Sequence, residues 1–405
     1  MKLTIGMSCY DDYDGVWFTI QSIKMYHSEC IDDINFVVID GNPESKHGKS
    51  CEKLISKLTN KHGNNGLYVK NVSWPSTASR DYIFQFATTP YVLCLDSHVM
   101  LQPGSIKKLI DYYDQNPTCN DLLQGPLLDD NGKLFANCME PKWDYNMFGT
   151  WLIDESKTSN TEPYEITMMG LGLFSCRKQA WPGFNPSFQG FGGEEGYIHK
   201  KFQKRGDKTL ILPWLKWNHR FDRPNGVPYR NEYIDRIKNY LLGWSELDVD
   251  TKDIKEYYSK PNTTPGQERE AVDMNILNDL DISLNHKNDK ISTINDDTIT
   301  KENAQLKERI IELEIRLLQS HSKHPVNVEP ITTHTNTPPT DSTVTTTPVE
   351  TPVETPVEIQ VESSELTSNK SNTNVSSAVE TYNERIYKQP PVTYSSPNIT
   401  STKPY

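Results

Sequence analysis

The chain has 405 residues, a formal net charge of −12 and a mean hydropathy of −0.66. This acidic balance, without a long run of Lys or Arg, excludes a large basic face for non-specific nucleic-acid binding. No stretch of about 18 apolar residues is present, which excludes a membrane-spanning helix. All eight Trp and all seven Cys precede residue 250. Large apolar groups are therefore available for one core only, in the first part of the chain.

This uneven composition predicts four parts. Residues 1–250 form the globular domain, and 251–297 are a polar linker. Residues 298–320 form a short coiled coil. Residues 321–405 are a disordered tail rich in Thr, Pro and Glu, which contains the repeat TPVETPVETPVE at 347–358.

The seven cysteines are odd in number, irregularly spaced and without a CxxC pair. We interpret them as reduced thiols of a protein in a reducing compartment. The N-terminus MKLTIGMSCYDD lacks a basic region followed by a long apolar run, which is the pattern of a signal peptide. The expected location is cytoplasmic.

Taken in chain order, the first hundred residues alternate between strand and helix patterns. Strands are predicted over 3–9, 34–43, 66–72 and 91–97, and helices over 15–27, 50–63 and 79–89. Such alternation is typical of an α/β fold with a mostly parallel sheet flanked by helices. Ligands of these sheets bind beyond the carboxyl ends of the strands, where Asp40 and Asp96 fall.

The second half of the domain has a looser pattern. Helices are predicted over 103–117, 194–206 and 232–247, and strands over 167–181 and 208–221. Beyond the domain, apolar residues alternate at spacings of four and three between Ile299 and Leu317, with Asn303 as a polar position of the seam. This pattern predicts a coiled coil and a homo-oligomer, and the alternative is a lone amphipathic helix.

Asp96 and His98 are the first candidate site residues. Residues i and i+2 of a strand face the same side, so both could contact one small object. A carboxylate oxygen and an imidazole nitrogen are ordinary ligands of a divalent cation. The alternative is that Asp96 caps the following turn and that His98 lies on a solvent-exposed surface.

Two later stretches add candidates. In FQGFGGEEGYIH (188–199), the glycines leave room for a ligand at the backbone, and Glu194 and Glu195 begin a helix. Their carboxylates could face a hydroxyl, although acidic residues in a first turn also stabilise the helix dipole. His219 in WNHRFDRP could complete a metal shell, with Arg220 nearby for phosphate. A single histidine at such a place could equally be structural.

These motifs together resemble a known family. The order SCYDD, VVIDGNP, ASRDYIFQFATTPYVLCLDSH, GFGGEEGYIHKKFQKRG and NHRF is similar to that of GT-A-fold glycosyltransferases of the broad family 2 type. DSH and GGEE resemble the DSH and GGEN of the polypeptide N-acetylgalactosaminyltransferases. The resemblance covers about residues 1 to 245. GGEE matches neither the retaining nor the inverting form of the motif, which leaves the stereochemistry open.

The resemblance implies a metal-dependent enzyme that moves a sugar from a nucleotide-sugar, UDP-linked by expectation, to an acceptor hydroxyl. Mn²⁺ or Mg²⁺ would be the cofactor, held by Asp96, His98 and His219. Donor contacts would come from Tyr10, Asp12, Asp40, Arg80, Asp96 and Ser97. The acceptor side would carry Glu194 and Glu195. Some inverting enzymes have the motif GGED where this chain has GGEE. Glu195 is the expected base of an inverting reaction because it aligns with the Asp of that motif.

Other classes stay open from the residues alone. Asp96, His98 and His219 could hold the zinc of a metal-dependent hydrolase, although such sites usually show more ligands at tight spacing. A non-catalytic protein that binds a sugar nucleotide and acts through its tail is a further alternative. The acceptor could be a glycan, a protein or a small molecule, and the acidic balance disfavours modified DNA.

Overall fold

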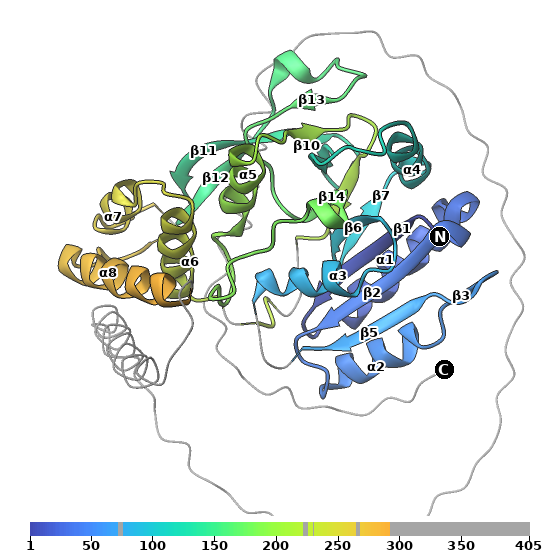
Figure 1. The fold of residues 1–405 in the computed structure, drawn as a ribbon, viewed down its shortest axis with the longest axis horizontal. Coiled ribbons are helices and arrows are strands. Elements are labelled where there is room, and N and C mark those ends of the chain that lie inside the picture. The colour runs from blue at the N-terminus through green and yellow to red at the C-terminus, as the bar shows by residue number, and fades with distance from the viewer. Residues whose placement is uncertain (72–75, 222–225, 230, 265–267, 292–405) are drawn as a thin grey trace, which may run out of the picture.

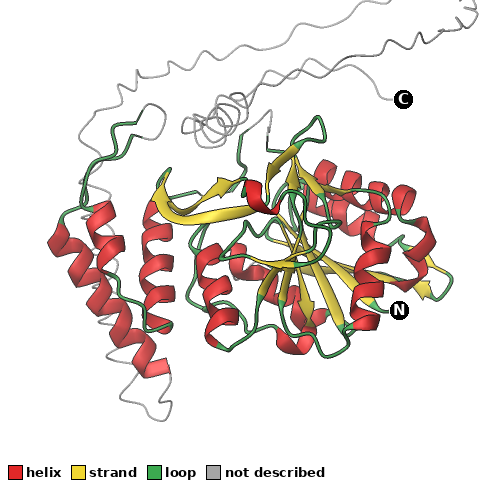
Figure 2. Ribbon diagram, turned by 90° about the horizontal axis from the view of Figure 1, so that it is seen from above, coloured by secondary structure: helices red, strands yellow, loops and turns green. Residues whose placement is uncertain are grey.

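In a computed structural model of the chain, the described residues are 1–71, 76–221, 226–229, 231–264 and 268–291. They form a mixed α/β fold with one large sheet and helices on both of its faces (Figures 1 and 2). The coiled coil predicted over 298–320 and the tail predicted over 321–405 lie outside the described residues.

The large sheet has eight strands in the order β13-β15-β8-β14-β6-β1-β2-β5. Its parallel part is formed by β6, β1, β2 and β5, which the sequence predicts in their correct places. β14 joins β6 and β8 in antiparallel fashion, and β13 is antiparallel to β15. The bounds are β1 Leu3–Cys9, β2 Ile34–Asp40, β5 Gly66–Lys70, β6 Tyr91–Asp96, β8 Leu122–Gln124, β13 Tyr164–Glu165, β14 Leu173–Arg177 and β15 Thr209–Ile211.

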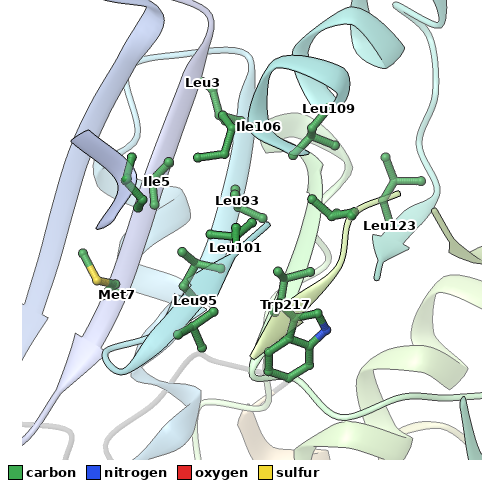
Figure 3. Packing of buried hydrophobic residues seen from close by; sticks show 14 of the residues in the cluster. Leu3, Ile5, Met7, Leu93, Leu95, Leu101, Ile106, Leu109, Leu123 and Trp217 are labelled. Carbon is green, nitrogen blue, oxygen red and sulfur yellow. The ribbon is translucent and has the colours of Figure 1, made fainter. Parts of the chain in front are cut away.

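Strand periodicity divides the core between the two faces of this sheet. On β6, Leu93 and Leu95 pack into one apolar cluster, whereas Val92 and Cys94 pack into the other. The first cluster contains Ile5, Met7 and Trp217 with residues of β8 and of the helix after β7 (Figure 3). The second lies under α3, α5 and α6, so that both faces are covered.

Five of the six predicted helices begin and end within three residues of their predicted bounds, but the one expected over 50–63 ends at Ile55 and is followed by the short strands Thr59–Asn60 and Gly63–Asn64. Their bounds are α1 Tyr13–Tyr26, α2 Lys46–Ile55, α3 Asp81–Phe86, α4 Ser105–Gln115, α5 Glu194–Lys204, α6 Tyr233–Glu246, α7 Lys252–Tyr258 and α8 Met274–Ile291. Short 3₁₀ turns are η1 Ser28–Asp33, η2 Thr77–Arg80, η3 Glu155–Lys157 and η4 Lys178–Ala180. The helix expected over 50–63 starts earlier, because Ser45 accepts a hydrogen bond from Gly48 N and caps it.

The end of the predicted strand 208–221 belongs to a second sheet. That segment splits into β15 and β16 (Trp217–His219), since Pro213 interrupts it. β16 lies between β9 (Leu127–Leu128) and β7 (Val99–Leu101), and β9 pairs with β10 (Leu134–Ala136). His219 is opposite Val99 in this register, so it lies beside the end of β6.

Two hairpins complete the described strands. β3 (Thr59–Asn60) pairs with β4 (Gly63–Asn64), and β11 (Cys138–Asp144) pairs with β12 (Met147–Leu152). The β11–β12 hairpin reaches toward α6, as Figure 1 shows. At its tip, Asn146 contacts residues of α6 and of the segment that follows α7.

The described part of the predicted linker 251–297 differs from that prediction. It contains α7 and α8, which pack with α6 at the end of the molecule away from α2 (Figure 1). Ile254, Tyr258, Leu277 and Leu280 are buried in the second core cluster. The catalytic-domain boundary expected at residue 250 is therefore too early, because these apolar side chains belong to the same core.

All seven cysteines lie in the described residues, and none forms a disulfide, as the sequence predicts. Among the residues that the structure describes, no helix has the length and apolar character that a membrane span requires.

Candidate active site

A cavity of about 410 Å³ opens at the carboxyl ends of β1 and β6. Parallel strands bring their ends to one edge of the sheet, so residues far apart in sequence meet here. Of the predicted site residues, the lining includes Tyr10, Asp12, Arg80, Asp96, Ser97 and His98. The described lining also includes residues from the loop before α5 and from the start of α6.

The three predicted metal ligands converge beside this cavity. His98 Nε2 lies 3.1 Å from His219 Nε2, and His219 Nε2 lies 3.3 Å from an Asp96 oxygen. One ligand atom from each of the three residues lies within 4.8 Å of the other two. The side chain of Asp96 is 26% exposed, whereas those of His98 and His219 are 6% and 10% exposed. The site is therefore open to solvent on the side of the Asp96 carboxylate. Two imidazoles and a carboxylate suit Mn²⁺ and also zinc.

Arg80 supplies the positive charge of the site. Its Nη2 donates to Asp96 Oδ1 at 2.9 Å, and its Nη1 lies 3.6 Å from Glu194 Oε1. Burial opposes ionisation of Asp96, but Arg80, His219 and His98 together hold the pKa of that carboxyl well below its usual range. Asp96 is therefore ionised at neutral pH and can hold a cation.

Asp12 makes four hydrogen bonds within the site. One oxygen accepts from Ser97 Oγ at 2.8 Å and faces His98 Nδ1 at 2.7 Å. The other accepts from Arg220 Nη2 at 2.7 Å and from Gly15 N at 3.3 Å. Burial acts to raise the pKa of Asp12, but the bonds to His98 and Ser97 and the charge of Arg220 lower it overall. The carboxylate is thus committed to protein partners.

Asp40, one of the expected donor contacts, is buried and is not among the described residues that line the cavity. It is 1% exposed, and its two oxygens accept from Asn42 N at 2.8 Å and from Tyr68 Oη at 2.7 Å. Burial raises the pKa of this carboxyl. Its neighbour Gly41 lines the cavity, together with Asn71, whose N–H donates to the Asp40 carbonyl oxygen.

Glu194 and Glu195 begin α5, as predicted, but neither is part of the described cavity lining. Glu194 is 1% exposed and lies behind Arg80. Glu195 is partly exposed. Burial, and then the adjacent Glu194, raise the pKa of Glu195 to about 8.

The glycines before α5 allow this loop to pack closely against α6. Gly190, Gly192 and Gly193 all have positive φ, at 58°, 94° and 95°. A Cβ on any of them would meet α6, where Asp235, Arg236 and Asn239 lie within 2.8 Å of the added atom. The glycines therefore let this loop pack against α6, and Gly190 also lines the cavity, so the expected room for a ligand at this backbone stays a prediction.

Several lining residues are not predicted by the sequence motifs. Phe191 stacks near Tyr229 with ring centroids 5.9 Å apart, and Tyr10 meets Tyr229 edge-on at 6.5 Å. Asp235 of α6 is 3% exposed and also lines the cavity. Phe191 falls inside the FQGFGGEE motif, but nothing in its local pattern indicates that it stacks near Tyr229.

Comparisons with known proteins give one family model and several similar solved structures. Residues 4–175 match the model of the family described as glycosyl transferase family 2. A structure of GalNAc-T7 with UDP, GalNAc and Mn²⁺ is similar, with a TM-score of 0.50 and 17% identity over 70% of this chain and 54% of that chain. S. aureus TarS 1–349 aligns at a TM-score of 0.40 and 10% identity, over 77% of this chain and 81% of that chain. No curated protein matches.

The fold is therefore GT-A, the fold of the enzymes that transfer sugars from nucleotide-sugars. More specifically, residues 4–175, which are less than half of the chain, match the glycosyl transferase family 2 model, and the chain shares its fold with GalNAc-T7. It spans about half the length of GalNAc-T7.

Proposed function

We propose that this protein transfers a sugar from a UDP-sugar to an acceptor hydroxyl in a metal-dependent reaction. The convergence of Asp96, His98 and His219 beside the cavity carries this proposal. These residues would hold Mn²⁺ or Mg²⁺, which offsets the negative charge on the departing nucleoside diphosphate. GalNAc-T7 was solved with UDP and Mn²⁺, which supports the same donor class here.

Arg80 and the aromatic residues have separate tasks in this proposal. Arg80 lines the cavity next to Asp96, so its guanidinium can face a phosphate oxygen while it stays paired with the carboxylate. Tyr10, Tyr229 and Phe191 offer flat apolar faces for the nucleoside or the sugar ring. Asp40 would support the backbone of Gly41 and Asn71, rather than contact the base directly.

Glu195 is the proposed base if the transfer inverts the anomeric centre. A carboxylate with a raised pKa accepts a proton more readily once it is ionised. Glu194 would keep Arg80 in place, because its carboxylate is buried behind the guanidinium. In a retaining reaction both residues would only bind and orient.

The direct test is thermal unfolding of the full chain with UDP, GDP, ADP and CDP, each with and without Mn²⁺. UDP with Mn²⁺ should raise the melting temperature, since a ligand at 100 times its Kd stabilises by about 2.7 kcal/mol. Asp96→Ala should remove the Mn²⁺-dependent part. Hydrolysis of UDP-sugars should follow the same dependence. Metal uptake without any nucleotide effect would instead favour the hydrolase alternative.

A further inference from the structure

The position of Asp12 relative to His98 has a direct chemical consequence. An ionised carboxylate only accepts hydrogen bonds, so the imidazole nitrogen 2.7 Å from Asp12 Oδ2 must be the one that carries the proton. That nitrogen is Nδ1. The lone pair of His98 is then on Nε2, the atom that faces His219 and, beyond it, Asp96.

We propose that Asp12 is a positioning residue of the metal site, which fixes the Nδ1–H tautomer and the ring orientation of His98, so that the Nε2 lone pair is the one directed at the cation. This inference rests on the proposed function, and it gives Asp12 a different task from the expected donor contact. In metal sites, a ligating histidine commonly donates a hydrogen bond to a carboxylate from the ring nitrogen that does not bind the metal.

The surroundings of Asp12 keep its carboxylate in this one orientation. Its backbone is the N-cap of α1, and its side chain accepts from Gly15 N. Arg220, which follows the ligand His219, donates to its second oxygen at 2.7 Å. Asp12 therefore joins the segments of two predicted ligands, His98 and His219, through one carboxylate that is 15% exposed.

Asp12→Asn tests this role, because Asn caps helices as well as Asp does and has nearly the same shape. Its amide can donate to His98 Nδ1, which favours the Nε2–H tautomer and blocks the ligand atom. Mn²⁺ affinity of the full chain without nucleotide, measured by electron paramagnetic resonance, should fall about 10- to 100-fold. Nitrogen-detected NMR of the metal-free protein should show His98 changing from Nδ1–H to Nε2–H.

Asp11→Asn is the matched control, since it removes one negative charge at the adjacent position. Asp11 accepts from Asn42 Nδ2 at 3.0 Å, and its φ of 50° is one that Asn tolerates. This variant should bind Mn²⁺ within about twofold of wild type. Equal melting temperatures of both variants would show that the fold is kept.

The outcomes separate the two proposals. If Asp12→Asn binds Mn²⁺ as wild type does and His98 keeps its tautomer, the positioning role is overturned. The same holds if the variant loses only UDP affinity, because Asp12 would then be a donor contact. If the wild type itself binds no Mn²⁺, with or without UDP, the metal-dependent function fails instead.

Discussion

Glu195 is one residue whose protonation affects both folding and catalysis. Its pKa is about 8 in the folded protein and close to 4.5 in an unfolded chain. The folded state therefore holds the proton more tightly between these values, and stability falls as the pH rises from 4.5 through 8. Glu195→Gln should be more stable than wild type at pH 9, by more than about 1 kcal/mol, and similar to it at pH 4.

Urea unfolding at both pH values measures this difference. Glu29→Gln, at an exposed position, is the control and should change neither value. If Glu195 is also the base, wild-type kcat/KM should rise as the pH increases through 8, and the variant should lose that rise together with its activity. A gain in stability that is equal at pH 4 and pH 9 would contradict the raised pKa.

Gly15 allows the close approach on which Asp12 depends. A Cβ at this position would lie 2.3 Å from Asp12 Oδ2 and 2.7 Å from the Ser97 carbonyl oxygen. Helix propensity alone favours Ala over Gly by about 1 kcal/mol. We expect Gly15→Ala to destabilise nevertheless, by about 1 to 3 kcal/mol as overpacked sites do, and to weaken Mn²⁺ binding. Unfolding and metal titration of the same sample check this; a more stable variant with full Mn²⁺ affinity would refute it.

At the residue scale, sequence patterns predict some of this site and not the rest. Asp96 and His98 are close in the chain, so strand geometry is enough to suggest that they share a ligand. His219 is 121 positions from His98, so strand spacing cannot place it beside Asp96 and His98, although its own motif suggests a metal ligand. The Asp12–His98–Arg220 contacts, and the cavity lining by Asp235, depend on how α1, β16 and α6 pack, which no local pattern records.

At the element scale, the segment after α6 holds the β11–β12 hairpin. Arg269 is 6% exposed, and its guanidinium donates to Asn146 Oδ1 at 2.9 Å and to the Tyr258 carbonyl oxygen at 2.8 Å. Its cation also lies 4.8 Å from the Tyr258 ring centroid. The hairpin tip and α7 thus meet at one buried side chain.

Arg269→Ala should lower the free energy of unfolding by about 2 to 4 kcal/mol, since it leaves oxygens of four residues, Asn146, Tyr257, Tyr258 and Glu270, without their donor. Arg269→Lys should recover only part, because an ammonium group cannot donate in the same planar pattern. Denaturant unfolding of both variants measures this. Lys252→Ala, which removes an exposed ion pair with Glu256, is the control and should cost less than about 1 kcal/mol.

The packing of α7 and α8 also explains why a boundary at residue 250 is wrong. The region looks like a linker because its composition is polar. Composition does not distinguish the buried face of a helix from its exposed face. Ile276, Leu277, Leu280 and Leu284 nevertheless recur at helical spacing, and all four are buried. Each such side chain stabilises by about 1.5 to 3 kcal/mol when fully buried. Their sum approaches the 5 to 15 kcal/mol of a whole domain, so residues 1–250 alone should unfold at a much lower temperature than residues 1–291.

At the scale of the whole molecule, the seam from Ile299 to Leu317 predicts that the full chain self-associates. Leu306 and Leu313 occupy equivalent seam positions one heptad apart. Replacing both with Glu places like charges against each other in the seam, so light scattering should show an oligomer for wild type and a monomer for the double variant. Activity per chain should stay the same, because the described site is built from one chain.

A matched variant tests whether added negative charge alone, and not its position in the seam, turns the oligomer into a monomer. Gln305 lies one position before Leu306 and Gln319 lies two positions after Leu317, at places where a coiled coil faces solvent. Gln305→Glu with Gln319→Glu adds the same two negative charges and should leave the oligomer intact. A monomeric wild type would remove the coiled-coil prediction. An oligomer that survives both double variants would mean that another surface joins the copies, and the seam would then be a lone amphipathic helix.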